Sequence, residues 1–261
     1  MLFWFVVSCS LFPDTDTGDS RSRENPIGLD VRASTQAWYA VPKGWLNITL
    51  GSQPFTATHA DIGSDISLDP DVAPVLEARM KFTGSQGCGI RVAQIDAEGS
   101  GTADESFTYH GDVFGAGRRV RSELDFLLLQ GDYQFTFNPG DDLEVSAHAG
   151  AQFWSFSGRL RTLDAGPLLT TQRAFASAFW LAGIDFLWKA GSGLELRASA
   201  VGGDERTSQY FWEAEGDALL WIAGSVTLTA GYRIHVIRFR QSTNQSNLKF
   251  FGPTLGLEIA F

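Results

Sequence analysis

The sequence predicts an all-β fold of antiparallel strands, and three observations support this prediction. Apolar and polar residues alternate along most of the chain from about residue 29 onward, which is the period of two expected of a strand with one apolar face. No segment has a convincing helical pattern. Glycine is abundant, with 28 residues in 261, and Gly, Asn, Asp and Pro gather between the alternating segments as turn residues do.

The composition excludes several classes of protein. No apolar run approaches the roughly 18 residues of a spanning helix. With 20 basic and 30 acidic residues the formal net charge is −10, whereas nucleic-acid binding favours a basic surface. The two cysteines, Cys9 and Cys88, are too few for a disulfide scaffold or a cysteine-based zinc site. No phosphate-binding loop, dinucleotide fingerprint or HExxH motif occurs, so we expect no cofactor and no nucleic-acid partner.

The chain divides into three parts. Residues 1–12 contain a short apolar run with the length of an export-signal core. The stretch Val6-Val7-Ser8-Cys9 is similar to a bacterial lipobox, in which the cysteine is lipidated after cleavage; the alternative is a plain export signal. Residues 13–28 are polar and charged, as a linker is. Residues 29–261 form the single folded domain.

Ten alternating segments predict about ten strands, with eight or twelve as alternatives. Short and long connections follow one another in turn, and short connections carry turn sequences such as Asn138-Pro139-Gly140-Asp141. The segment 118–137 is long for one strand, and its apolar face switches between Leu128 and Leu129. This switch predicts a β-bulge near Gln130-Gly131 or a hidden turn. The predicted strands cover residues 30–40, 75–83, 88–97, 118–137, 142–160, 172–189, 193–203, 208–222, 225–239 and 248–261.

The C-terminal segment alternates most regularly. Counting back by twos from Phe261 gives Ile259, Leu257 and Leu255. This pattern resembles the last strand of bacterial outer-membrane β-barrel proteins, where such residues form the signal that the barrel assembly machinery reads. The resemblance implies an antiparallel transmembrane β-barrel in the outer membrane of a Gram-negative bacterium, surrounded by membrane lipid and lipopolysaccharide. It also implies short periplasmic turns, longer outer loops and outward apolar residues. It assigns no subfamily.

Aromatic residues are expected in two belts at the membrane interfaces. Phe251 and Phe261 share a face, and at about 3.3 Å per residue and a tilt near 40° they are about 25 Å apart along the barrel axis, the height of the apolar band. The periplasmic belt would hold Phe135, Phe137, Trp188, Trp221 and Phe261. The outer belt would hold Phe153, Trp154, Tyr210, Trp212, Phe250 and Phe251.

The inward face of the predicted barrel carries charges of both signs. An isolated buried charge is costly, so these groups should pair and close the lumen. Glu213, Glu215 and Asp217 would pair with Arg197 and Arg233, or alternatively favour cation passage. Further inward residues are Glu77, Arg79, Lys81 and Arg91. The predicted lumen charge network comprises Glu123, Asp125, Glu144, His148, Asp185, Glu195, Arg197, Glu213, Glu215, Asp217, Arg233, His235 and Glu258.

Arginines concentrate at the outer rim, where lipopolysaccharide presents phosphate groups. Arginine binds phosphate through two parallel hydrogen bonds, so the rim is either a lipopolysaccharide-facing surface or solvated loop charge. The predicted rim comprises Arg118, Arg119, Arg121, Arg159, Arg161, Arg173, Arg238 and Arg240.

No residues are predicted to be catalytic. Ser146, His148 and Glu144 share an inward face, but steps of about 6 to 7 Å along a strand keep the serine from direct contact with the base. The acidic loop 61–71 does not have EF-hand spacing, so no metal site is predicted. We therefore expect a structural or surface-interaction barrel. The alternatives are a small passive, porin-like channel and an enzyme that modifies lipid A or phospholipid.

Overall fold

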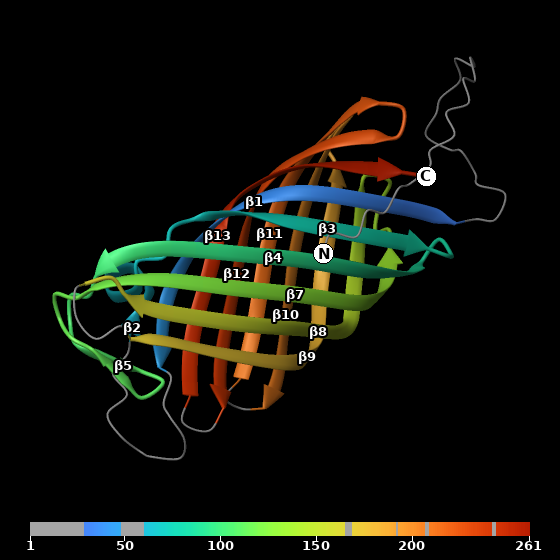
Figure 1. Ribbon diagram of the computed structural model, residues 1–261. Coiled ribbons are helices and arrows are strands. Elements are labelled where there is room, and N and C mark those ends of the chain that lie inside the picture. The colour runs from blue at the N-terminus through green and yellow to red at the C-terminus, as the bar shows by residue number, and fades with distance from the viewer. Residues whose placement is uncertain (1–28, 48–59, 165–168, 192, 207–208, 242–243) are drawn as a thin grey trace.

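The computed structural model describes residues 29–47, 60–164, 169–191, 193–206, 209–241 and 244–261, so the predicted signal and the predicted linker lie outside the described residues. Within this part of the chain, ten long strands form one closed antiparallel barrel (Figure 1). The predicted fold class is confirmed. In sheet order the strands are β1 (Asp30–Asn47), β3 (Asp71–Lys81), β4 (Gln86–Thr102), β7 (Arg119–Phe137), β8 (Leu143–Thr162), β9 (Thr170–Lys189), β10 (Leu194–Arg206), β11 (Gln209–Ala223), β12 (Val226–Gln241) and β13 (Asn244–Ala260).

The barrel closes where its first strand pairs with its last. β1 and β13 are antiparallel, with a register that runs from Arg32 opposite Ala260 to Asn47 opposite Gln245. The backbone N–H of Phe261 also donates to the carbonyl of Val31 at 2.8 Å. Closure leaves neither strand as an unpaired edge, as a β-structure in lipid requires. The end that carries the C-terminus and the connections after β3, β7, β9 and β11 is called the turn end, and the opposite end the cap end (Figure 1).

The outward face near the turn end is apolar. On β9 the outward residues Trp180, Ile184, Phe186 and Trp188 are 79%, 38%, 41% and 51% exposed. Phe261 is 54% exposed on the same belt. Such a continuous exposed apolar band matches the lipid-facing surface of a barrel. Among the described residues, no helix has the length and hydropathy needed to span a membrane.

The predicted bulge in segment 118–137 is wrong, and so is the hidden turn. β7 pairs with β4 and β8 without a register shift, and its burial alternates without interruption. Leu124, Phe126 and Leu128 therefore face inward, while Glu123 and Asp125 face outward.

The apparent switch on β7 has a physical cause. β8 has 20 residues, which corresponds to about 50 Å of height, roughly twice the apolar band. Toward the cap end the strands therefore rise beyond the bilayer, where the outside is water. There the polar residues face outward and the apolar residues fill the interior.

Buried aromatic side chains fill the lumen toward the cap end. Phe126 lies 5.3 Å from Phe250 and 6.3 Å from Trp154 between ring centroids. Trp154 in turn packs against Phe179 at 5.9 Å and Phe239 at 5.6 Å. The periplasmic belt is exposed as predicted, but Trp154 and Phe250 are 2% and 0% exposed, so their assignment to the outer belt is wrong. The aromatic layer comprises Trp38, Phe126, Trp154, Phe156, Phe175, Phe179, Phe211, Phe239 and Phe250.

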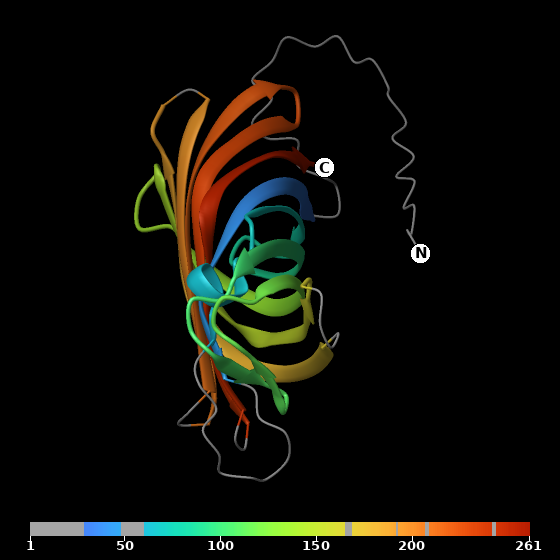
Figure 2. The same cartoon turned by 60° about the vertical axis from the view of Figure 1, so that its left-hand side comes forward.

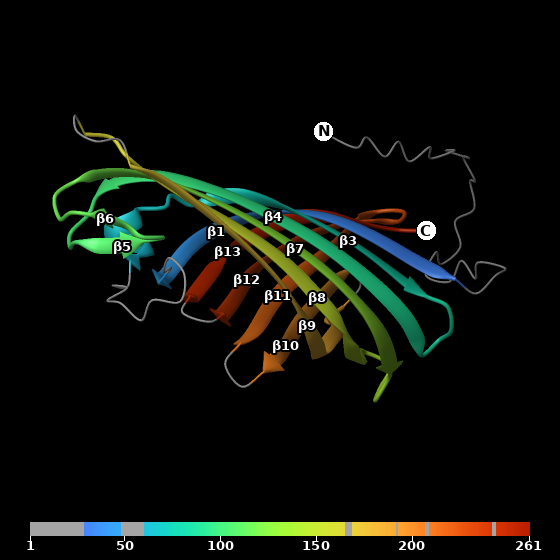
Figure 3. The same ribbon diagram turned by 60° about the horizontal axis from the view of Figure 1, so that its bottom comes forward.

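A cap of two short segments lies at the far end of the barrel (Figures 2 and 3). The first contains β2 (Ala60–Asp61) and a single π-helical turn, η2 (Ile62–Ile66). The Asp61 carboxylate accepts hydrogen bonds from the backbone N–H groups of Gly63 and Ser64 at 2.8 and 3.0 Å and so starts the turn. The second segment is a hairpin of β5 (Phe107–Tyr109) and β6 (Asp112–Phe114), which pair only with each other within the described residues.

The η2 turn packs tightly against β4 at Gly99. A Cβ atom at residue 99 would lie 1.8 Å from the carbonyl oxygen of Ser67, so Gly99→Ala should displace the turn while the barrel stays folded. We expect several-fold faster amide hydrogen exchange in residues 62–66 and unchanged exchange in β8 and β9. Gly216→Ala is the control, because a Cβ there meets no atom within 4 Å. Equal exchange in both variants would contradict this account.

Candidate functional site: the lumen charge network

Arg91 on β4 is the centre of the charged groups in the lumen. Its Nε donates to Glu77 Oε2 at 3.1 Å, and its guanidinium forms ion pairs with Glu213 and Glu215 on β11. Arg91 is 6% exposed and Glu213 is 4% exposed. The guanidinium therefore connects opposite walls of the barrel, since β4 and β11 are not neighbours in the sheet.

Arg233 on β12 forms the second part of the network. Its Nη2 lies 2.7 Å from the Glu215 carboxylate and donates to Gln36 Oε1 at 3.1 Å. Its guanidinium carbon lies 5.5 Å from the centroid of the Trp38 ring. His235, two residues along the same face, has Nδ1 2.9 Å from Glu213 Oε2. Arg233 and His235 are each 1% exposed, so these contacts are shielded from solvent.

His148 on β8 lies between two carboxylates. Its Nδ1 is 3.0 Å from Asp132 Oδ1 on β7, and its Nε2 is 3.0 Å from Asp185 Oδ2 on β9. Arg79 contributes to the same cluster, since its Nη1 donates to Asp185 at 3.0 Å and its Nε pairs with Glu77. Glu77 thereby joins the His148 cluster to Arg91.

Toward the turn end the network opens into a small cavity. Lys81 forms an ion pair with Glu144 at 2.5 Å, and Glu258 accepts from Arg197 at 2.8 Å and from Arg32 at 3.4 Å. The cavity has a volume of about 40 Å³, room for only one or a few water molecules.

The structure gathers most of the predicted network inside the barrel but corrects it in two places. Glu123 and Asp125 lie outside: Glu123 pairs with Arg121 at 3.4 Å and Arg159 at 3.0 Å. Arg197 pairs with Glu258 rather than with the Glu213 triplet. The inward residues are Glu144, His148, Asp185, Glu195, Arg197, Glu213, Glu215, Asp217, Arg233, His235 and Glu258.

Two lumen residues, Asp132 and Gln36, were not predicted from the sequence. Asp132 was missed because the supposed bulge obscured which face of β7 points inward, although unbroken alternation from Phe126 through Gln134 would have found it. Gln36, the partner of Arg233, carries no charge to attract notice.

The groups considered for catalysis do not assemble. The Ser146 hydroxyl pairs with Thr136 Oγ1 at 2.8 Å rather than with His148. In the acidic loop, Asp61 caps η2, and Asp65 accepts from the backbone N–H groups of Asp61 and Glu105 at 2.9 and 3.4 Å. Across the described ranges, no three side chains of the metal-binding types converge.

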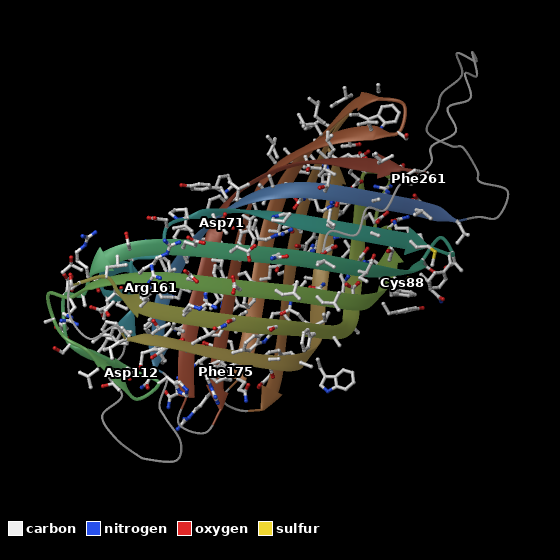
Figure 4. The ribbon with its side chains drawn as sticks, viewed as in Figure 1. Asp71, Cys88, Asp112, Arg161, Phe175 and Phe261 are labelled. Carbon is white, nitrogen blue, oxygen red and sulfur yellow. The ribbon has the colours of Figure 1, made fainter. Side chains whose placement is uncertain are left out.

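The rim arginines occupy three settings near the cap end (Figure 4 labels Arg161). Arg119, Arg121, Arg159 and Arg161 alternate with buried residues on β7 and β8 and so lie on the outer wall, and Arg121 is directly opposite Arg161. Arg118 lies 3.7 Å from Asp164, and Arg173 stacks 5.2 Å over Phe175. Arg238 and Arg240 are exposed on β12.

Comparison with known proteins identifies the fold. No protein-family model matches the chain, and neither does any curated protein. Among solved structures, the outer membrane protease OmpT from Escherichia coli superimposes with a TM-score of 0.60 at 8% identity, covering 93% of this chain and 100% of OmpT. OprG from Pseudomonas aeruginosa gives a TM-score of 0.42 at 10% identity, covering 89% of this chain and 95% of OprG.

The closed ten-stranded barrel, its outward apolar band and the likeness to OmpT define the fold class. The chain has the fold of the bacterial outer-membrane β-barrel proteins. In barrels of this fold the end with short turns faces the periplasm and the end with longer loops faces outward.

Arg91→Met should destabilise the barrel strongly. The substitution leaves Glu77, Glu213 and Glu215 without their shared cation, and breaking a buried ion pair costs about 3 to 5 kcal/mol. Urea unfolding in lipid vesicles, followed by tryptophan fluorescence, measures the loss. Arg238→Met is the matched control, since Arg238 is exposed and forms no ion pair within the described residues. Adding Glu213→Gln to Arg91→Met should restore part of the stability; an Arg91→Met barrel as stable as the control would refute this role.

Proposed function

We propose that this protein is a closed structural barrel that does not conduct ions and acts through its outer surface. The observation that supports this proposal is the arrangement of two different barriers in series within one lumen. The lower barrier is the charged layer around Arg91 and Arg233, whose side chains are 7% and 1% exposed. The upper barrier is the aromatic layer, in which Phe250 and Trp154 are 0% and 2% exposed.

The cap adds a third obstruction above these two layers. Ile62 and Ile66 of η2 are 0% and 2% exposed, and Phe107 and Phe114 of the hairpin are 2% and 0% exposed. A hydrated ion would have to displace paired charges, aromatic rings and the cap in turn. This arrangement disfavours the passive-channel alternative. The enzyme alternative gains no support from Ser146, because its hydroxyl pairs with Thr136 rather than with His148.

Planar-bilayer recording tests the closed barrel. The protein should remain silent across a range of potassium and calcium chloride concentrations, with an open porin as the positive control. Because the barriers are in series, Phe126→Ala with Trp154→Ala should also be silent, and so should Arg91→Ser with Glu213→Ser. Steady unitary currents from the unaltered protein would overturn the proposal.

We also propose that the outer wall binds the phosphate groups of lipopolysaccharide. This candidate is favoured by the direct cross-strand pairing of Arg121 with Arg161. Like charges placed opposite each other destabilise a sheet, and a phosphate between them would relieve the repulsion through charge-assisted hydrogen bonds. Arg121 has acidic partners in Glu98 and Glu123, but Arg161 has no ion-pair partner within the described residues.

Arg121→Gln with Arg161→Gln should weaken lipopolysaccharide binding roughly tenfold, the effect of losing one charge-assisted contact of about 1.4 kcal/mol. The measurement is the rise in melting temperature of the detergent-solubilised barrel as lipopolysaccharide is added. Lys189→Gln is the control, since it removes an exposed cation from the turn end, away from the rim. Equal stabilisation of both variants would exclude the Arg121–Arg161 pair as the binding site.

A further inference from the structure

The two segments of the cap are attached to the barrel in different ways. The η2 segment is part of the wall: β2 pairs with β1, and the backbone N–H of Asp69 donates to the Glu98 carbonyl at 2.9 Å. The Ser122 hydroxyl also donates to the Ile66 carbonyl at 2.7 Å from inside the barrel. Moving η2 would break sheet hydrogen bonds, so this segment is a fixed part of the fold.

The β5–β6 hairpin has no such backbone ladder with the wall within the described residues. Side-chain contacts connect its strands to β8 and β9: the Tyr109 hydroxyl donates to the Gly158 carbonyl at 3.0 Å, and Thr171 donates to the Asp112 carboxylate. Burial raises the pKa of Tyr109 above its usual range, so the hydroxyl keeps its proton. The hairpin can therefore swing outward without breaking a strand pairing of the barrel.

The wall is shaped to receive this contact. A Cβ atom at Gly158 would lie 2.7 Å from the Tyr109 hydroxyl oxygen, so a larger residue there would displace the tyrosine. The connection that follows the hairpin contains Gly117 at φ +77°, with no atom near its Cβ position. The backbone N–H of Gly117 donates to the carbonyl of Ala103 at 2.8 Å, so this connection anchors the base of the hairpin and Tyr109 latches its strands to the wall.

The hairpin lies over the aromatic layer of the lumen. Phe107, Tyr109 and Phe114 belong to the same hydrophobic cluster as Phe156 and Phe175. Deeper in that layer, Trp154 Nε1 and His235 Nε2 are buried and have no hydrogen-bond partner among the described atoms. Buried polar atoms are nearly always paired, so these two atoms are available to a partner that enters from outside.

We propose that the β5–β6 hairpin is a lid, latched by Tyr109 and Asp112, over a binding site for a planar, mainly apolar molecule with a hydrogen-bond acceptor. Opening exposes three aromatic rings of the hairpin, and a planar ligand would replace the contacts that the layer beneath loses. The acceptor would pair with the Trp154 N–H. The charged layer below stops the ligand from passing through, so the site is entered and left from outside.

Hydrogen exchange separates a lid from a rigid cap. Tyr109→Phe removes the latch but keeps the ring, and it should accelerate exchange in residues 107–114 several-fold while residues 62–66 stay unchanged. Ser122→Ala is the control on the fixed segment and should have the opposite pattern. Unchanged exchange in the hairpin, or an equal increase in both segments, would overturn the lid.

A disulfide tests whether the lid controls binding. Asp112→Cys with Thr171→Cys, in a chain with Cys9 and Cys88 replaced by serine, places two thiols where a side-chain hydrogen bond now joins these residues. Quinoline, a planar ring with one acceptor nitrogen, is the probe, and saturation-transfer NMR in nanodiscs measures its binding. The reduced form should bind quinoline at least tenfold more tightly than the oxidised form. Equal binding, or no binding in either form, would overturn the proposal.

This inference rests on the closed barrel of the proposed function, and one measurement keeps the two apart. Tyr109→Phe should remain silent in planar bilayers, because the Arg91 layer is still in place. Current through this variant would overturn the closed barrel, whereas the exchange and quinoline results would still decide on the lid.

Discussion

Each long strand of this barrel passes through two different surroundings, and this constraint determines the rest of the structure. In the bilayer the outside is hydrocarbon, so outward residues must be apolar and polar residues face inward. Beyond the bilayer the outside is water, so the interior has to supply the apolar core. On β7 a single unbroken alternation therefore has Tyr133 outward and Asp132 inward near the turn end, but Asp125 outward and Phe126 inward near the cap end. The charged layer and the aromatic layer are both consequences of this change.

The charged layer has to pair internally because its groups are surrounded by the wall. Arginine suits this task, since a planar guanidinium offers several donors in fixed directions. Arg91 contacts Glu77, Glu213 and Glu215 at the same time. Arg233 contacts Glu215, and one face of its guanidinium lies over the Trp38 ring. Arg91 thereby bridges walls that are distant in the sheet, whereas Arg233 pairs with Glu215 on the neighbouring strand β11. A network of this kind leaves little space in the lumen, because the paired side chains occupy it.

The sequence predicted the strands well because the membrane-spanning parts obey one simple rule. The inward faces of β8, β9, β11 and β12 could be read by alternation alone, and His148, Asp185, Glu213 and Arg233 were placed in the lumen correctly. The same rule failed above the bilayer, where it put Glu123 and Asp125 inside and Trp154 outside. The pairing itself was beyond reach: Arg91 and Glu213 are 122 positions apart and meet only because of the barrel's register and strand tilt.

The cap decides how such a closed barrel can act. Gly99 and Gly158 lie on the inner wall where Ser67 and Tyr109 approach it, and neither position could carry a side chain without moving the cap. Glycine weakens a strand, so these positions cost stability that close contact with the cap offsets. These close contacts indicate that the cap is an integral part of the fold. Under the proposed function, recognition would occur either on the arginine-bearing outer wall or beneath the hairpin, since the charged and aromatic layers would block the lumen below.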